Sequence, residues 1–426
     1  VVASGPQLSG TAGVRFWTLY AECLADTGGD ASRAAEAVGR ASSMVSDGAD
    51  AADVELAASR LARARADAQA ERTLLRAALD HMGADDPGGR AAEGRANLAD
   101  LLVRAGELPA AVSEAGLALR SAGSDLVRHA TTLGYTHLAA GQLASAELVF
   151  RSAEARAGQE CRPAWRAAAG LVVVLATQGR YSEAAELGET AERAGRAGAP
   201  GAPLAALQLA LAELDLALFR LGVARSRVDQ ALDAVRGEMP PHLEVRLALV
   251  RARLAWEEGN LPSAVDVAEQ ALNNASVNRS RGGAAEIRGV RGGLVCARGR
   301  ADVGWIDLAA AASQLVEIGA LPGMARVAEL ATLCIDDGAI VEPLWTTLDA
   351  WLVRERARPA RLARAVNRLR HVRQRGWDDA AEAVALRGAW TDLVDQLVPG
   401  DAAALLVHPW ARLAGAGGGD PRAGRR

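Results

Sequence analysis

Small and apolar residues recur along the chain at the spacing of two antiparallel helices joined by a glycine. The clearest example spans residues 131–155 and has Gly141 at its centre; its small or apolar positions are Leu133, Gly134, Ala146, Phe150 and Ala153. The positions before the glycine share one face of a helix, and those after it share one face of a second helix. Because glycine tolerates the conformation that ends a helix, Gly141 predicts the turn between them.

The same pattern recurs around other glycines. Gly106, Gly141, Gly179 and Gly259 follow one another at separations of 35, 38 and 80 residues, and the longest gap leaves room for one more unit. We expect that unit near Gly222, although Arg227 stands where a small residue belongs. Weaker units are expected upstream, between residues 34 and 77, and downstream around Gly299, Gly338 and Gly376.

One such hairpin cannot bury its own apolar face, so the hairpins must stack on one another. The sequence therefore predicts an all-α fold, an α-solenoid of stacked antiparallel helix pairs. Val172–Val174 is the one stretch that could pass for a strand, and we interpret it as helical.

The repeating unit resembles the tetratricopeptide repeat, whose period is about 34 residues. The family's small-residue positions match Gly134, Ala146 and Ala153 in the best unit, and Ala99, Ala111 and Ala118 in the unit before it. The early Trp of the family is missing, and its closing Pro is mostly replaced by Gly or Arg, which leaves the number of units open. The resemblance implies a right-handed superhelix whose concave groove takes peptides or helices of other proteins.

We divide the chain into three segments. Residues 1–14 are expected to be an N-terminal extension, residues 15–410 the repeat array, and residues 411–426 a disordered tail rich in Gly and Arg. The most convincing units cover residues 92–198 and 245–278.

Composition supports helices and narrows the function. Half of the residues are hydrophobic but only 4% are aromatic, a balance that favours closely packed helices over sheets. All 48 basic residues are Arg, so a phosphate-loop lysine and a Schiff-base lysine are excluded. A net charge of −4 gives no reason to expect a nucleic-acid or membrane surface. We see no signal peptide or membrane span, and expect a bacterial, cytoplasmic protein.

No residue pattern points to catalysis. Cys23, Cys161, Cys296 and Cys334 are far apart and form no CxxC, so we expect reduced, structural cysteines. The six histidines show no metal-ligand spacing, and no nucleophile motif is present. We therefore expect no enzymatic activity, no cofactor, no metal and no small-molecule substrate.

Candidate binding residues follow from the resemblance, which places partner contacts on the first helix of each pair. Those positions carry Arg128, Tyr135, Arg166, Arg246, Arg253 and Trp256. A row of guanidinium groups beside two aromatic rings suits an acidic peptide with an apolar anchor. The alternative is that these are ordinary solvated arginines. A second basic stretch, between Arg354 and Arg375, lacks interleaved aromatic residues and is interpreted as a solvated or partner-facing helix rather than a nucleic-acid site.

The favoured function is a non-catalytic scaffold or adaptor that binds a partner peptide or helix in its groove. The alternative is the sensory or regulatory half of a signalling protein, such as a transcriptional regulator, a Ser/Thr kinase or a caspase-like protease, without its effector domain. An effector domain in the adjoining reading frame would favour the second.

Overall fold

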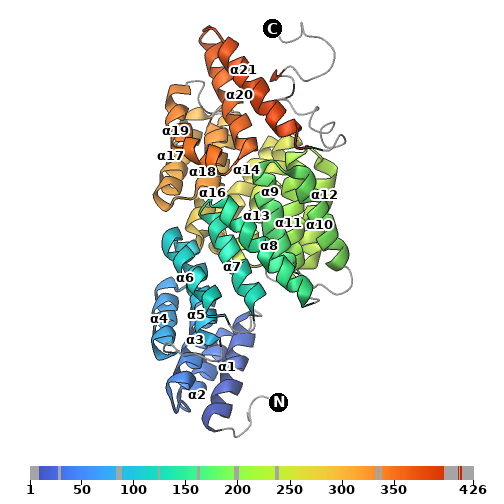
Figure 1. Ribbon diagram of the computed structural model, residues 1–426. Coiled ribbons are helices and arrows are strands. Elements are labelled where there is room, and N and C mark those ends of the chain that lie inside the picture. Colours follow the sequence, from blue (N-terminus) through green and yellow to red (C-terminus); the bar gives the residue numbers. More distant parts are fainter. Residues whose placement is uncertain are drawn as a thin grey trace. The chain divides into compact units, whose positions relative to one another are not determined.

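The chain is all-helical throughout the part that the computed structural model describes. That part comprises residues 9–26, 30–82, 89–122, 125–160, 164–195, 201–235, 239–331, 334, 338–397, 411 and 413–414, and it contains no strand (Figure 1). Val172–Val174 lies within a helix, as predicted. None of the described helices is long and apolar enough to cross a membrane. The chain divides into two compact units, Val1–Thr136 and His137–Arg426, where the sequence predicted one continuous array.

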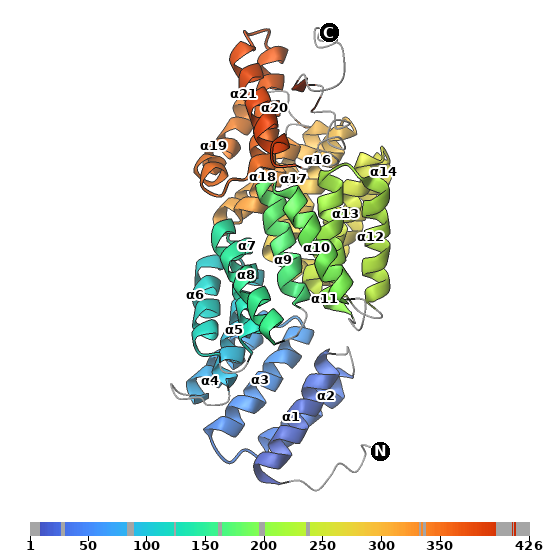
Figure 2. The same cartoon turned by 45° about the vertical axis from the view of Figure 1, so that its right-hand side comes forward.

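The first unit is a stack of antiparallel helix pairs. Its helices are α1 (Gly10–Asp26), α2 (Ala31–Ser42), α3 (Gly48–Ala64), α4 (Ala68–Met82), α5 (Arg90–Ala105), α6 (Leu108–Arg120) and most of α7 (Leu126–Ala139). From α1 to α6 each helix packs on its sequence neighbours, and α3 also packs on α1 (Figure 2). Ala99, Ala111 and Ala118 have no exposed surface, so the small-residue positions are where α5 and α6 approach each other. Because α1 begins at Gly10, helical structure starts inside the segment expected to be an extension.

The second unit continues the pairing. Its helices are α8 (Leu143–Gln159), α9 (Trp165–Gln178), α10 (Tyr181–Gly195), α11 (Ala202–Ala217), α12 (Leu221–Ala234), α13 (Pro241–Glu257), α14 (Leu261–Asn273), α15 (Ala275–Asn278), α16 (Arg281–Ala297), α17 (Ala301–Ile318), α18 (Leu321–Ala331), α19 (Gly338–Arg354), α20 (Arg358–Gln374) and α21 (Ala380–Val394). The expected tail lies outside the described residues except for Ala411, Leu413 and Ala414.

Close approach between helices explains several glycines of this unit. A Cβ atom on Gly170 of α9 would lie 2.2 Å from Cζ of Phe150 on α8. Phe150 is fully buried, so its ring fills the space that a side chain at position 170 would need. Ala146, on the same helix as Phe150, is also fully buried.

The turns show why one unit was hard to locate. Gly106, Gly141, Gly179, Gly259, Gly299 and Gly376 all have positive φ, as their predicted role in turns requires. Phe219 takes the same conformation, with φ of 57°, midway between Gly179 and Gly259. Gly222, the predicted turn, is instead inside α12. Gly338 likewise begins α19, and the turn before α18 uses Gly319. The prediction for Gly222 was wrong because a residue other than Gly, here Phe219, can occupy the left-handed region at a cost of about 1–2 kcal/mol. The prediction for Gly338 was wrong because Gly319 makes the turn.

Arg227 is accommodated by a polar network in place of a small residue. Its guanidinium contacts Glu192 of α10 at 2.7 Å, Gln208 of α11 at 3.0 Å and Asp215 of α11 at 3.7 Å. Asp215 is 4% exposed and also pairs with Arg220 at 2.8 Å. A large cation therefore fits between three helices because carboxylates meet it there.

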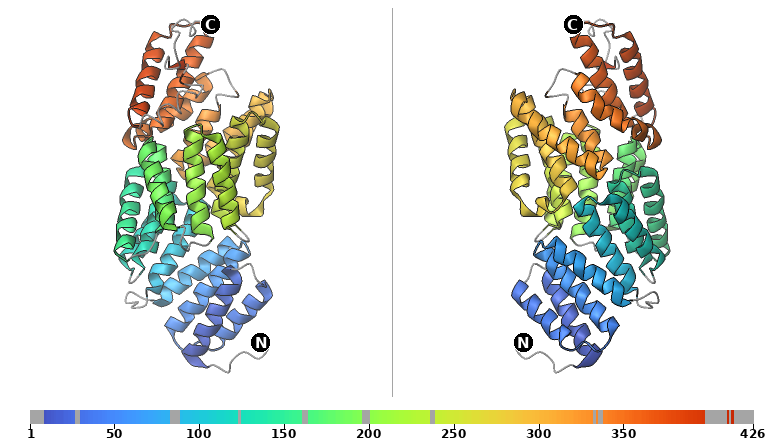
Figure 3. Two further views of the ribbon diagram at one scale, coloured as in Figure 1. Left: turned by 90° about the vertical axis from the view of Figure 1, so that its right-hand side faces the viewer. Right: turned by 90° about the vertical axis from the view of Figure 1, so that its left-hand side faces the viewer.

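The inner helices of the second unit form a closed cycle of contacts. Packing runs from α9 to α11, α13, α16, α18 and α20, and from α20 back to α9. We call these six the inner helices. Figure 3 shows the second unit from two opposite sides. In a linear stack each repeat contacts only its neighbours. The contact of α20 with α9 therefore adds a long-range tertiary contact to the pairing between neighbours.

The cysteines differ from the sequence prediction. Cys296, at the end of α16, and Cys334, between α18 and α19, form a disulfide with Cα atoms 4.7 Å apart, a separation typical of such bonds. The prediction that all cysteines are reduced was therefore wrong for this pair. The two cysteines are 38 residues apart, and no sequence motif indicated that they pair. They come together only because α17 and α18 fold back between them. Cys23 is exposed, and Cys161 lies outside the described residues.

Candidate functional site: the inner charge cluster

In the first unit, charges alternate along consecutive first helices. Arg60 of α3 lies 3.4 Å from Glu22 of α1 and 2.5 Å from Glu93 of α5. Glu93 is in turn 3.6 Å from Arg128 of α7. We call these four residues the charge ladder. Arg128 keeps 44% of its side chain exposed, whereas Arg60 is largely occupied by its two carboxylates.

In the second unit, Arg246 of α13 is held tightly by a neighbouring helix. Its Nε donates to Oε1 of Glu213 on α11 at 2.6 Å, and its Nη2 donates to Oε2 at 2.8 Å. This two-pronged geometry is the strongest form of an Arg–carboxylate pair. The Arg246 side chain is only 15% exposed, so the pair also links α11 to α13.

A second pair joins α16 to α18. Nη2 of Arg326 lies 2.7 Å from Oε2 of Glu286. A Cβ atom on Gly323 would lie 2.4 Å from Oε1 of Glu286, so the missing side chain on α18 leaves room for this carboxylate. Arg326 also interacts electrostatically with Glu213 and Glu329. Because Arg326 reaches carboxylates on α16 and α11 together, it must face the inside of the cycle.

Glu329 of α18 lies close enough to the two preceding pairs to interact with their charges. Burial raises the pKa of Glu329, and Arg253 and Arg326 offset only part of that effect while Glu257 adds to it. Tyr181, at the start of α10, is 3% exposed and interacts electrostatically with Arg253 and Glu329. Burial raises the pKa of the Tyr181 hydroxyl, which therefore stays protonated at neutral pH.

Seven ionisable side chains thus face one another from four inner helices. We call them the inner charge cluster: Glu213, Arg246, Arg253, Glu257, Glu286, Arg326 and Glu329. Four carboxylates face three guanidinium groups, so the cluster is nearly balanced. Half of the Arg326 side chain and 43% of the Arg253 side chain remain exposed. Cations on the inside of the cycle are therefore within reach of solvent.

The structure separates the six predicted site residues into two groups. Arg128 and Tyr135 belong to the first unit, and Tyr135 is half-buried on α7. The four in the second unit are Arg166, Arg246, Arg253 and Trp256. Of these, only Arg246 and Arg253 share the inner charge cluster. Arg166 is exposed on α9.

Trp256, the expected apolar anchor of the groove, lies near the end of α13. It is half-buried, and its ring packs against the hydrophobic cluster formed by Ala252, Ala264, Val265 and Leu294. Its apolar surface therefore contributes first to the contact among α13, α14 and α16.

Sequence reasoning missed the acidic half of the cluster. Glu213 precedes Arg246 by 33 residues, and Glu286 precedes Arg326 by 40. Opposite charges one repeat apart on first helices were the signal that could have found them, since such positions lie side by side in a stack.

The basic stretch before Arg375 is largely ion-paired. Arg358 and Arg361 both lie 3.3 Å from Asp392, Arg364 lies 3.1 Å from Glu342, and Arg373 lies 2.6 Å from Asp379. Carboxylates of α19, α21 and the turn before α21 therefore neutralise much of α20. Phosphate binding would require these guanidinium groups to exchange their carboxylate partners; a solvated or partner-facing helix remains the prediction.

Across the described ranges, no group of three or more His, Cys, Asp or Glu side chains is arranged to hold a metal ion. The inner charge cluster consists of charge pairs between helices, together with the Arg253–Glu257 pair within α13.

No protein-family model and no curated protein sequence matches the chain. Several solved structures align with the chain at low sequence identity. A tetratricopeptide repeat protein from Parabacteroides merdae aligns at 14% identity with a TM-score of 0.42, over 67% of this chain and 98% of that one. PilF of Pseudomonas aeruginosa aligns at 20% identity with a TM-score of 0.36, over 53% and 91%. A Rap protein complexed with competence and sporulation factor aligns at 11% identity with a TM-score of 0.48, over 90% and 99%.

The chain has a tetratricopeptide-like helical-repeat fold. The likeness concerns the fold alone, because all three identities are low.

Proposed function

We propose that the chain is a non-catalytic protein-interaction scaffold that holds a segment of a partner protein on the inner face of its second unit. The observation that carries this proposal is the inner charge cluster. A surface that served packing alone would be filled with apolar side chains, since buried ion pairs contribute little stability compared with apolar packing. Here four inner helices instead direct seven charged groups at one another, and two of the cations keep much of their surface exposed.

Arg253 is the best candidate for a direct contact with an acidic group of the partner. Nε of Arg253 lies 3.8 Å from Oε1 of Glu257, the guanidinium also interacts electrostatically with Glu329, and 43% of the side chain is exposed. Arg246, by contrast, would first have to release two short hydrogen bonds to Glu213. We therefore assign Arg253 to partner binding and Arg246 to holding α11 against α13. Arg128, Tyr135 and Arg166 remain candidate contacts.

Site-specific photo-crosslinking in a lysate of the native host tests the proposal. A photoreactive amino acid at position 253 should capture one or a few defined proteins. The same amino acid at position 251 is the matched control, because Arg251 lies on the same helix, is exposed, and points to a different side two residues earlier. Equal capture at both positions, or none at position 253, would contradict binding at the inner face.

Once the partner is known, titration calorimetry measures the contribution of the charge. Arg253→Glu should weaken binding several-fold to a hundredfold, about 1–3 kcal/mol, and the loss should shrink in 1 M salt, where screening acts within about 3 Å. Arg251→Glu should leave the affinity unchanged.

A further inference from the structure

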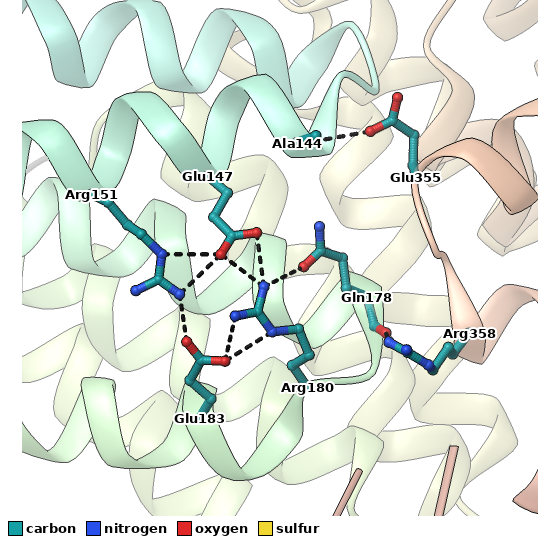
Figure 4. A network of polar contacts seen from close by, with 8 residues as sticks. All are labelled: Ala144, Glu147, Arg151, Gln178, Arg180, Glu183, Glu355 and Arg358. Atoms are coloured by element: carbon teal, nitrogen blue, oxygen red, sulfur yellow. Dashed lines mark hydrogen bonds and ion pairs between the residues drawn. The ribbon is translucent and has the colours of Figure 1, made fainter. Parts of the chain in front are cut away.

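Three polar contacts join the end of α19 and the start of α20 to α8, to the turn before it and to the end of α9. Trp351 Nε1 donates to the carbonyl of Gly141 at 2.7 Å, and the amide of Ala144 donates to Oε2 of Glu355 at 3.1 Å. Nη1 of Arg358 donates to the carbonyl of Gln178, also at 3.1 Å. We call these three contacts the clasp. Figure 4 shows Glu355 and Arg358 reaching Ala144 and Gln178, beside the Glu147–Arg180 ion pair.

The clasp recognises the ends of helices. Ala144 is in the first turn of α8, where amides lack a partner within the helix and the helix dipole favours an acid such as Glu355. Gln178 is the last residue of α9, where the dipole favours a cation such as Arg358. Trp351 is 2% exposed and Glu355 is 6% exposed, so solvent is largely excluded from two of the contacts.

Two turn glycines make room for the clasp. A Cβ atom on Gly141 would lie 3.0 Å from Nε1 of Trp351, and one on Gly179 would lie 2.7 Å from Cδ1 of Leu393. Both glycines have positive φ. Glycine therefore meets two requirements at each position: it tolerates the backbone conformation of the turn, and it leaves space for the side chains of α19 and α21.

A covalent bond fixes the segment that leads to the clasp. Cys334 lies between α18 and α19, and its disulfide ties this connection to the end of α16. The point from which α19 departs toward α8 is therefore attached to an inner helix. The α19–α20 hairpin itself meets α8 and α9 through noncovalent contacts, so the bond acts on them only by fixing the connection before α19.

We propose that the Cys296–Cys334 disulfide is a redox latch that keeps the clasp closed and so regulates access to the inner charge cluster. Control of access rests on the function proposed above, whereas control of the clasp does not. In the oxidised protein the cycle stays closed, and in the reduced protein it opens more often.

The difference in exposure between the two cysteines decides which sulfur an external thiolate attacks. Cys334 is half-buried, whereas Cys296 is 5% exposed and packs so closely on α17 that a Cβ on Gly304 would be 2.2 Å from its Sγ. A thiolate of an external dithiol attacks Sγ of Cys334, the S–S bond breaks, and Cys296 leaves as a thiolate that takes a proton from water. The second thiol of the dithiol then displaces Cys334. The protein gains two electrons and two protons, and the dithiol becomes a disulfide.

Hydrogen exchange of the unbound protein, followed by mass spectrometry, tests the latch without any partner. Cys23 and Cys161 are first replaced by Ser, so that only the Cys296–Cys334 pair responds to a dithiol. Reduction should speed exchange in peptides that contain Ala144 by roughly tenfold, while peptides from α3 to α5 in the first unit keep their rates. Cys334→Ser should match the reduced protein in the presence and absence of the dithiol.

Trp351→Phe separates the clasp from the disulfide. This variant keeps an aromatic side chain but loses the indole N–H that donates to Gly141, so peptides containing Ala144 should exchange fast in both redox states. The proposal is overturned if exchange at Ala144 is the same in oxidised and reduced protein when the mass difference of two hydrogens proves that the bond was cut. It is also overturned if thiol titration finds both cysteines reduced after air oxidation. Neither outcome bears on crosslinking at position 253.

Discussion

The two units of this chain use similar helix pairs but are held together differently. In the first unit, the charge ladder runs from one first helix to the next, with Arg60 bonded to Glu22 and Glu93. In the second unit, the chain returns to its own beginning, and the contact of Trp351 with Gly141 spans 210 residues. Stability in the first unit should therefore be a sum of neighbouring contacts, whereas the second should respond as a closed whole.

The largest effect is expected from a buried carboxylate of the first unit. Glu71 is 1% exposed, and its Oε1 lies 2.7 Å from Nε of Arg63 and 2.8 Å from Nη2 of Arg104. Glu71→Ala should cost about 3 kcal/mol, the low end for a broken buried pair, because two guanidinium groups lose their buried partner and keep Asp100, which is exposed. Native-state hydrogen exchange should show faster exchange in α3, α4 and α5 only.

The control for Glu71→Ala is Glu36→Ala. Glu36 pairs with Arg40 one turn away and is 61% exposed, so its loss should change the free energy of unfolding by less than about 0.5 kcal/mol. Faster exchange throughout the second unit after Glu71→Ala would refute the picture of independent neighbouring contacts.

A matched pair of buried glycines probes packing in each unit. A Cβ on Gly304 in the second unit would lie 2.2 Å from Sγ of Cys296 and 2.4 Å from the carbonyl oxygen of Gly292. Backbone cannot move aside cheaply, so Gly304→Ala should cost about 1–3 kcal/mol. The destabilisation should reach α8 and α20 as well, if the cycle acts as one.

Gly94→Ala makes the same change in the first unit. There the nearest atom is Cδ2 of Leu79 at 3.2 Å, the end of a flexible side chain. Since Ala favours a helix over Gly by about 1 kcal/mol, the melting temperature should stay the same or rise. If Gly94→Ala were as costly as Gly304→Ala, the difference between backbone and side-chain obstacles would not explain the two sites.

Local signals predicted the repeating part of the fold. Gly141 and Gly179 mark turns because their positive φ is a property of a single residue, and Ala111 and Ala118 mark helix contacts because their period is local. The turn at Phe219 escaped because nothing in its own chemistry favours that conformation. Arg227 was recognised as an exception, but its partners Glu192 and Asp215 are known only from the fold.

The repeat register placed Arg246 and Arg253 on first helices, and their role in binding stays a prediction. Glu286 and Glu329 were missed because a carboxylate on a helix surface looks the same whether it faces solvent or another inner helix. The disulfide and the clasp had no local signature, since both depend on the return of the chain after α18. Features that close the second unit are thus the ones that sequence periodicity cannot show.

The smallest effect concerns a strained turn of the first unit. Ala66, between α3 and α4, is exposed and has φ of 61°, a conformation that disfavours residues with a Cβ by about 1–2 kcal/mol. Glycine relieves this strain but loses more conformational entropy on folding, about 0.5–1 kcal/mol, so Ala66→Gly should stabilise the protein by roughly 0.5 kcal/mol. Ala110→Gly is the control of opposite sign, because Ala110 is exposed within α6, where the same change should cost about 1 kcal/mol. Both effects should appear only in exchange from the first unit, measured on either side of the turn. If Ala66→Gly slowed exchange around Ala144 as well, the two units would share stability, and the contrast between a linear stack and a closed cycle would have to be abandoned.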